Sequence, residues 1–134
     1  MTSHLLAVFI GGGLGACSRF LMTLVVTDLF AGKGSLPFGT MFCNVTGSFL
    51  IGLAAAFAVG SSFEQHPLFR HLILIGFLGG YTTFSSFSLE TMTLLQSGKT
   101  VAATLNAVGS MTLCLVGVTL GSLLGNFVRT HTTG

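Results

Sequence analysis

Four long apolar stretches, separated by short polar interruptions, constrain the fold of this chain more than any other feature of its sequence. They run over about residues 5–30, 37–60, 68–95 and 101–128. Each is long enough for a helix of about 20 residues, the length that crosses the hydrocarbon core of a bilayer. Only 6% of the 134 residues are charged, against about 25% in a typical soluble domain. The sequence therefore predicts an all-α integral membrane protein, with four transmembrane helices forming a single membrane domain over residues 1–134.

The third stretch contains a segment that an ordinary spanning helix does not carry. A glycine pair, Gly79 and Gly80, is followed closely by Thr82 and Thr83 and then by a run rich in serine. Glycine and β-branched residues weaken a helix, and backbone groups released inside a membrane must be buried in protein or line an aqueous path. We therefore expect a broken third helix, with an ion site at the break.

Small residues recur at helical spacing in the other three stretches. Two glycines four residues apart, or a ladder of such pairs, let helix backbones approach without large side chains between them. The ladders are Gly11 and Gly15; Gly39, Cys43 and Gly47; and Gly117, Gly121 and Gly125. We expect these residues to be mainly structural, and part of this small-residue surface to form a subunit interface.

Polar residues inside the spans are the candidates for function. Thr40, Asn44 and Ser48 share one face of the second stretch, and Asn106 and Ser110 lie one turn apart in the fourth. A hydroxyl inside a membrane helix can bond to the backbone of its own helix. An asparagine amide does so only weakly, so we expect Asn44 to line a path or to bond across helices.

Aromatic and charged residues cluster around the expected break. Phe84 and Phe87 lie on one helical face, three residues apart, and Glu90 follows one turn later. The edge of a phenyl ring carries partial positive charge, so rings turned edge-on can hold a small anion weakly. Arg19 lies within the first stretch, where it can either raise the local anion concentration or brace the break through hydrogen bonds. Of these two roles we favour bracing.

Basic residues are nearly balanced between the two ends of the four expected helices. Arg70, Arg129 and the terminal amine fall on one side, and Lys33 and Lys99 fall on the other. Orientation in a membrane normally follows an excess of lysine and arginine on the cytoplasmic side. Two interpretations stay open: both orientations coexist and pair as an antiparallel homodimer, or a lipid or a weak bias selects one.

The histidines and cysteines show no metal-ligand spacing. The histidines lie at the expected helix ends, where we expect them to be solvated, and the cysteines lie on three different helices, where we assign them no chemistry. These residues are His4, His66, His71, His131, Cys17, Cys43 and Cys114.

Three motifs resemble those of the CrcB/Fluc fluoride channels, and the resemblance extends over essentially the whole chain. They are G-x-x-G-A-x-x-R-F at residues 12–20, P-x-G-T-x-x-x-N-x-x-G at residues 37–47, and GFLGGYTTFSSFSxE at residues 76–90. The third motif is highly specific. One departure is Asn106, at a position where family members often carry a tyrosine.

The resemblance implies an antiparallel, dual-topology homodimer with two fluoride pores. It implies Phe84, Phe87 and Asn44 as pore residues, and a polar track that contains Thr40, Ser110 and Glu90. It also implies a structural sodium ion at the dimer centre, held by the backbone carbonyls of Gly79 and Thr82.

The function implied by the resemblance is passive export of fluoride through the cell inner membrane, which gives fluoride resistance. The expected partners are fluoride, a second copy of the chain and the lipid bilayer, with no nucleic acid. We do not expect an enzyme, since no nucleophile, base and orienting group converge in the sequence. The alternatives are a proton-coupled fluoride antiporter, with Glu90 as proton relay, and a non-transporting subunit of a larger membrane complex.

Overall fold

The computed structural model describes residues 1–32, 34–60, 66 and 68–132, and these residues form helices joined by short connections. The elements are α1 (Thr2–Leu29), α2 (Phe38–Ala58), the π-helix η1 (Phe69–Leu78), α3 (Gly79–Tyr81), α4 (Phe84–Gln96), α5 (Thr100–Thr104), the π-helix η2 (Leu105–Gly109) and α6 (Ser110–Thr132). Four helical runs are long and apolar enough to cross a membrane: Thr2–Leu29, Phe38–Ala58, Phe69–Gln96 and Thr100–His131. The prediction of an all-α protein with four such helices is confirmed.

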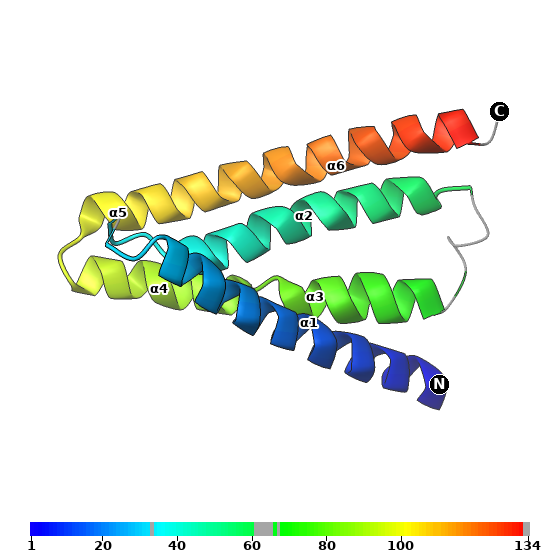
Figure 1. The fold of residues 1–134 in the computed structure, drawn as a ribbon, viewed down its shortest axis with the longest axis horizontal. Helices are drawn as coiled ribbons and strands as arrows, with labels where there is room; N and C mark the ends of the chain where they lie inside the picture. Colours follow the sequence, from blue (N-terminus) through cyan, green and yellow to red (C-terminus); the bar gives the residue numbers. More distant parts are fainter. Residues whose placement is uncertain (33, 61–65, 67, 133–134) are drawn as a thin grey trace.

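The four runs lie lengthwise beside one another, with both ends of the chain at one end of the bundle (Figure 1). α6 packs along α2, while α1 crosses the third run and contacts η1 and α3 (Figure 1). The connections that follow α1 and α4 lie at the opposite end of the bundle. This arrangement leaves α4 beside α5 and η2, close to the candidate polar residues of the fourth run.

The third run leaves the helical conformation at two residues. Thr82 has φ −89° and ψ 155°, and Thr83 has φ −152° and ψ 118°, so both are extended between α3 and α4. The Thr83 hydroxyl accepts a hydrogen bond of 3.2 Å from the backbone N–H of Ser86. Thr83 therefore caps the N-terminus of α4, a position that threonine favours because its side chain satisfies one of the unpaired N–H groups of the first turn.

The small-residue ladders pack within the chain. On α6, a Cβ added at Gly121 would overlap the Phe49 carbonyl of α2. On α1, a Cβ added at Gly15 would overlap the Phe77 carbonyl of η1. The α2 ladder is buried in the same way, with Gly39 against Thr23 of α1. The ladders thus bring helices of one chain together, and the expectation that part of the small-residue surface forms a subunit interface stays a prediction.

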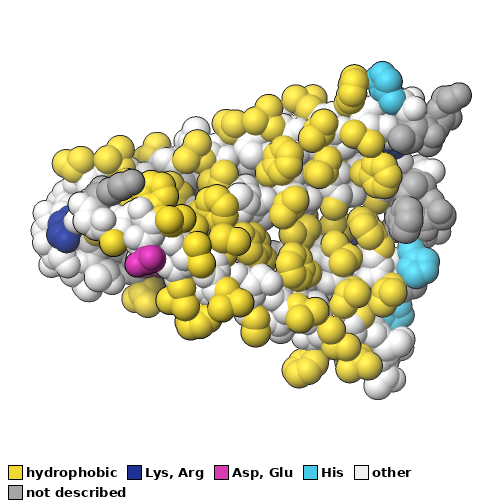
Figure 2. Space-filling view, in the orientation of Figure 1, with side chains coloured by type: hydrophobic (Ala, Val, Ile, Leu, Met, Phe, Trp, Pro, Cys, Tyr) yellow, Lys and Arg dark blue, Asp and Glu magenta, His cyan; other side chains and the backbone are white. Residues whose placement is uncertain are grey.

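The outer surface carries most of the large apolar side chains. Figure 2 shows hydrophobic side chains spread over one face, with charged and histidine side chains toward its two ends. The buried apolar residues are mostly small, and Cys43 and Ala103 are only 0% and 1% exposed. Helices pack through small residues and present large ones outward when the solvent is lipid. This distribution identifies the protein as a multi-pass membrane protein.

Two of the histidines meet at the end of the bundle where the chain begins. His4 of α1 and His71 of η1 are both half-buried, and their Nδ1 atoms lie 3.2 Å apart. We expected the histidines to be solvated, but in this pair both rings are half-buried and contact each other. The two residues are 67 positions apart in the sequence, and only the packing of α1 against η1 brings them together.

Candidate functional site

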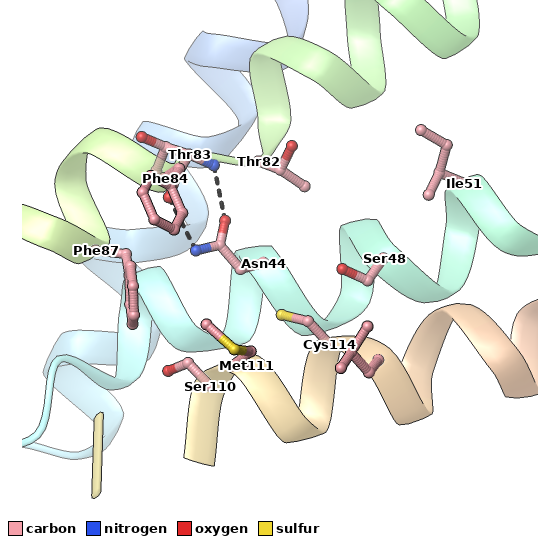
Figure 3. Close-up of a pocket in the computed structure, with 11 residues that line it drawn as sticks. Asn44, Ser48, Ile51, Thr82, Thr83, Phe84, Phe87, Ser110, Met111 and Cys114 are labelled. Atoms are coloured by element: carbon pink, nitrogen blue, oxygen red, sulfur yellow. Dashed lines mark hydrogen bonds between the residues drawn. The ribbon is translucent and has the colours of Figure 1, made fainter. Parts of the chain in front are cut away.

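A pocket of about 320 Å³ opens between α2, α4 and α6, next to the extended residues Thr82 and Thr83 (Figure 3). It combines hydroxyl and amide groups with two phenyl rings and several apolar side chains. The lining residues are Asn44, Ser48, Ile51, Thr82, Thr83, Phe84, Phe87, Ser110, Met111, Cys114 and Leu115.

Asn44 connects α2 to the extended segment through both ends of its amide. Its Nδ2 donates to the Thr83 carbonyl at 3.0 Å, and its Oδ1 accepts from the Thr83 N–H at 2.7 Å. Figure 3 shows these two bonds side by side at the edge of the pocket. The amide thus bonds to backbone groups that the interrupted helix leaves without helical partners. A backbone N–H or C=O without a hydrogen bond is costly inside a membrane. A side-chain amide carries two N–H groups, so one donor remains for the pocket.

Phe84 and Phe87 lie beside Asn44 in the first turn of α4 (Figure 3). Their ring centroids are 5.4 Å apart, with an angle of 44° between the ring planes. Phe84 is 73% exposed, so packing within the chain does not explain its presence. A tilted pair of this kind directs positive ring edges, rather than only negative faces, toward neighbouring groups.

Ser110 belongs to a chain of three polar side chains. Its hydroxyl donates to Asn106 Oδ1 at 3.1 Å, and Asn106 Nδ2 donates to the Thr91 hydroxyl of α4 at 2.8 Å. Asn106 is 1% exposed. Asn106, which belongs to η2, is therefore buried, and it ties η2 to α4 and orients Ser110 at the start of α6.

Thr40 and Glu90 form a second polar contact outside the pocket lining. The Thr40 hydroxyl donates to Glu90 Oε1 at 2.6 Å, which joins α2 to α4. The other carboxyl oxygen, Oε2, is buried and has no hydrogen-bond partner in the part of the chain that the structure describes. Thr40 precedes Asn44 by one helical turn, so this contact continues the same face of α2.

Arg19 reaches the segment before the break from α1. Its Nε donates to the Gly80 carbonyl at 3.2 Å. In a continuous helix that carbonyl would accept from residue 84, but Phe84 begins a new helix. Arg19 therefore supplies a donor at the point where the backbone ladder is interrupted.

The carbonyls of Gly79 and Thr82 lose their usual donors at the same interruption. The Thr83 N–H, which would serve Gly79 in a continuous helix, donates to Asn44. The Ser86 N–H, which would serve Thr82, donates to the Thr83 hydroxyl. Gly79 is also exposed, and a Cβ there would meet only Leu74 O, at 3.9 Å.

The structure thus gathers some of the residues singled out in the sequence and separates others. Asn44, Thr82, Phe84, Phe87 and Ser110 line one pocket. Thr40, Glu90, Arg19 and Gly79 lie outside that lining.

The sequence analysis did not identify two further residues as part of the site, Thr83 and Thr91. Thr83 holds the Asn44 amide and Thr91 holds Asn106. Threonine just before a helix is a recognisable capping signal, and it could have identified Thr83. Nothing local marks Thr91, because its partner lies on another helix.

Known proteins match this chain over most of its length. The family model described as CrcB-like protein, Camphor Resistance (CrcB), matches residues 6–122. A protein of Shewanella baltica named fluoride-specific ion channel FluC is 46% identical over 122 residues, which are 91% of this chain and 95% of the relative. A protein of Coxiella burnetii with the same name is 43% identical, over 91% of this chain and 97% of the relative. A third, from Shewanella oneidensis, is 43% identical over 91% and 95%.

Proposed function

The chain belongs to the CrcB family, and from this membership together with the pocket at Asn44 we propose that it is a fluoride-selective ion channel of the cell inner membrane. It lets fluoride leave the cell passively, down its electrochemical gradient, and so gives fluoride resistance. The relatives from Shewanella baltica and Coxiella burnetii are named as channels for this ion, and the assignment is to transport rather than to enzyme chemistry.

The observation that supports this most directly is that the Asn44 amide and the phenyl rings of Phe84 and Phe87 line a single pocket. Fluoride is small and strongly hydrated, so a pore must replace its water with several donors while holding the ion weakly enough to release it. Asn44 keeps one N–H after bonding to Thr83. Phe84 and Phe87 add weaker contacts that do not trap the ion.

We propose that Ser110, Thr40 and Glu90 extend the path from this pocket toward the end of the bundle that carries α5. The Ser110 and Thr40 hydroxyls donate to Asn106 and Glu90 in the structure. A hydroxyl can rotate about its C–O bond to point its single proton elsewhere. Each can therefore turn toward a passing anion and return afterwards, which makes the contact brief.

The polar path of one chain covers only part of the bundle, and this favours a second copy. The polar residues of α2 lie in its first half, and residues 49–58 are all apolar or glycine. A pocket of about 630 Å³ beyond them, between α2, η1 and α6, has only apolar residues in its lining. An antiparallel copy would place its own polar half at that level. We therefore propose a dual-topology homodimer, which the balance of basic residues permits.

A structural sodium ion fits the extended segment in such a dimer. The carbonyls of Gly79 and Thr82 have lost their helical donors, and uncharged carbonyl oxygens are suitable ligands for a small monovalent cation. Two copies would supply four such oxygens. We propose that the ion joins the two breaks at the dimer interface and does not move with fluoride.

Efflux from liposomes tests the proposed function. The purified chain is reconstituted with internal potassium fluoride, a potassium ionophore starts the flow, and an electrode follows external fluoride. We expect rapid fluoride efflux, little chloride efflux in a parallel preparation, and no dependence on a proton gradient. Chloride efflux as fast as fluoride would contradict the proposal. A strict requirement for a proton gradient would indicate an antiporter, and no flux from folded protein would indicate a non-transporting subunit.

A further inference from the structure

The His4–His71 pair has no part in the proposed ion pathway, and its geometry is unusual. The two Nδ1 atoms are 3.2 Å apart, the ring centroids are 4.4 Å apart, and the ring planes meet at 62°. A hydrogen bond between two Nδ1 atoms requires that one ring carries its proton on Nδ1 and the other presents a lone pair there. The two imidazoles therefore face each other through the same ring atom, Nδ1.

That spacing is the one found between two ligands of a single metal ion. Two imidazole nitrogens that bind zinc at about 2.0–2.1 Å, with a tetrahedral angle between them, lie about 3.3–3.4 Å apart. The observed separation of 3.2 Å needs only a small rotation of the rings to match it. The donating ring can move its proton to Nε2, which leaves both Nδ1 atoms as neutral ligands.

The helix packing holds the two rings in place before any ligand arrives. Gly11 lies two turns along α1 from His4, and a Cβ added there would overlap the Leu72 carbonyl, next to His71 in η1. The backbones of α1 and η1 are thus in direct contact close to the pair. Both rings are half-buried, so they are partly desolvated and still reachable from the water at this end of the bundle.

We propose that His4 and His71 form a binding site for a divalent first-row transition metal, of which zinc is the representative. Two imidazoles suit zinc, copper and nickel, whereas magnesium and calcium require oxygen ligands. No group of three or more histidine, cysteine or acidic side chains capable of holding a metal occurs among the described residues. Water completes the coordination, and the affinity is micromolar rather than that of a closed structural site.

A bound ion would connect the start of α1 to the start of η1. α1 also carries Arg19, which donates to the Gly80 carbonyl before the extended segment. Metal binding would therefore stabilise the part of the fold that supports the interruption, because a ligand that binds only the folded state raises stability as its concentration exceeds its Kd. The site lies at the end of the bundle, apart from the pocket at Asn44, so it stabilises the protein without obstructing that pocket.

Zinc binding to the purified chain in detergent micelles tests this proposal. Cys17 and Cys114 are first replaced by alanine, because thiolates also bind zinc. Calorimetric titration with zinc chloride should give one ion per chain at micromolar affinity, and saturating zinc should raise the melting temperature by several degrees. His4→Ala and His71→Ala should each weaken binding at least tenfold and abolish the thermal shift. Magnesium chloride should produce neither effect.

Two sets of variants serve as controls. His131→Ala removes a histidine that contacts Phe127 on α6, and it should leave zinc binding unchanged. His4→Gln and His71→Gln keep a hydrogen-bonding side chain but remove the imidazole, so they should fold, conduct fluoride and still fail to bind zinc. Undiminished zinc affinity in the combined His4→Ala, His71→Ala chain would overturn the proposal. Absence of zinc binding to the folded parent chain would overturn it equally.

Discussion

Asn44 serves the backbone and the pocket at the same time, and this dual use explains why an amide is suited to the position. One N–H and the carbonyl oxygen are occupied by Thr83, while the second N–H remains. A carboxylate of the same shape could accept from the Thr83 N–H, but it could not donate to the Thr83 carbonyl. A hydroxyl is too short to make both bonds. The residue therefore couples the position of the extended segment to the donor that the pocket offers.

Replacement of Asn44 by aspartate is expected to abolish fluoride flux. The change removes the donor to Thr83 O and the donor to the pocket, and an ionised carboxylate would also repel the anion. We expect flux to fall at least tenfold in the liposome assay. Asn126→Asp makes the same chemical change at an exposed position of α6 and should retain most of the flux. Equal flux in both variants would show that Asn44 does not contact the ion.

The contribution of the phenyl rings to fluoride flux can be measured separately from their contribution to the stability of the fold. Phe84 is 73% exposed, so Phe84→Ile should change the free energy of unfolding by no more than about 0.5 kcal/mol, while the positive ring edge is lost. Phe87→Ile should act in the same way, at a cost of about 1 kcal/mol because this residue is half-buried. We expect fluoride flux to fall at least tenfold in each variant, measured in protein that elutes like the parent chain.

A matched control for the ring variants is Phe9→Ile. Phe9 is 78% exposed on α1, outside the pocket lining. It should conduct like the parent chain, because the ring contacts neither Asn44 nor the extended segment. Undiminished flux in both Phe84→Ile and Phe87→Ile would remove the rings from the proposed path.

At the scale of helices, glycine determines which elements pair. The α2–α6 contact brings backbones so close that Gly121 faces the Phe49 carbonyl directly. In a bilayer, helices associate through such close packing, because apolar side chains gain little free energy by moving from lipid into a helix interface. The same kind of contact at Gly15 joins α1 to η1. These two pairs of elements form the two halves of the bundle, and the pocket lies where α4 meets α2 and α6.

Gly121→Ala is expected to destabilise the chain by about 1–3 kcal/mol, because the added methyl group overlaps a backbone carbonyl that cannot move alone. Gly13→Ala on α1 is the matched control: a Cβ there meets nothing within 4 Å. That change should be neutral, or stabilising by up to about 1 kcal/mol through helix propensity. Thermal unfolding in detergent, followed by circular dichroism, measures both. Equal stability of the two variants would contradict the role assigned to Gly121.

The sequence and the structure agree best where the signal is local. The four spans follow from apolar length, and Thr83 marks the start of α4 by its capping chemistry. Asn44 was recognisable because an amide is costly in lipid. Its partner was not, since Thr83 lies 39 residues away. The glycine ladders show the same limit: their spacing indicates close packing but does not say whether the neighbouring helix belongs to the same chain.

Across the whole molecule, lysine and arginine are nearly balanced between the two ends of the expected helices. Arg70 lies in the first turn of η1 and Arg129 in the last turn of α6, whereas Lys99 directly precedes α5; Lys33 lies outside the described residues. The rule that places lysine and arginine in the cytoplasm acts on a difference between the two ends, and that difference is small here. A small difference permits both orientations, which the proposed antiparallel pair requires.

Dual topology predicts that each end of the chain is reachable from both sides of the membrane. Cys17 and Cys114 are replaced by alanine, while Cys43, which is 0% exposed, is kept. Single cysteines are then introduced at opposite ends as Thr130→Cys and Ser97→Cys, both at exposed positions. Treatment of cells and of inverted vesicles with a membrane-impermeant maleimide should label about half of each variant from either side, since the charge bias is near zero.

The two positions control for each other, because a single orientation would label Thr130→Cys from one side only and Ser97→Cys only from the other. That complementary pattern would exclude the antiparallel dimer.

A further change separates orientation from folding: three lysines added after residue 134 place new positive charge at one end and should retain that end in the cytoplasm. If function requires pairs of opposite orientation, labelling then becomes one-sided and fluoride flux falls. A second chain, with three lysines added in the loop between α4 and α5, should be fixed in the opposite orientation. Coexpression of the two chains should then restore the flux. If the added lysines had simply damaged the fold, coexpression would not restore it.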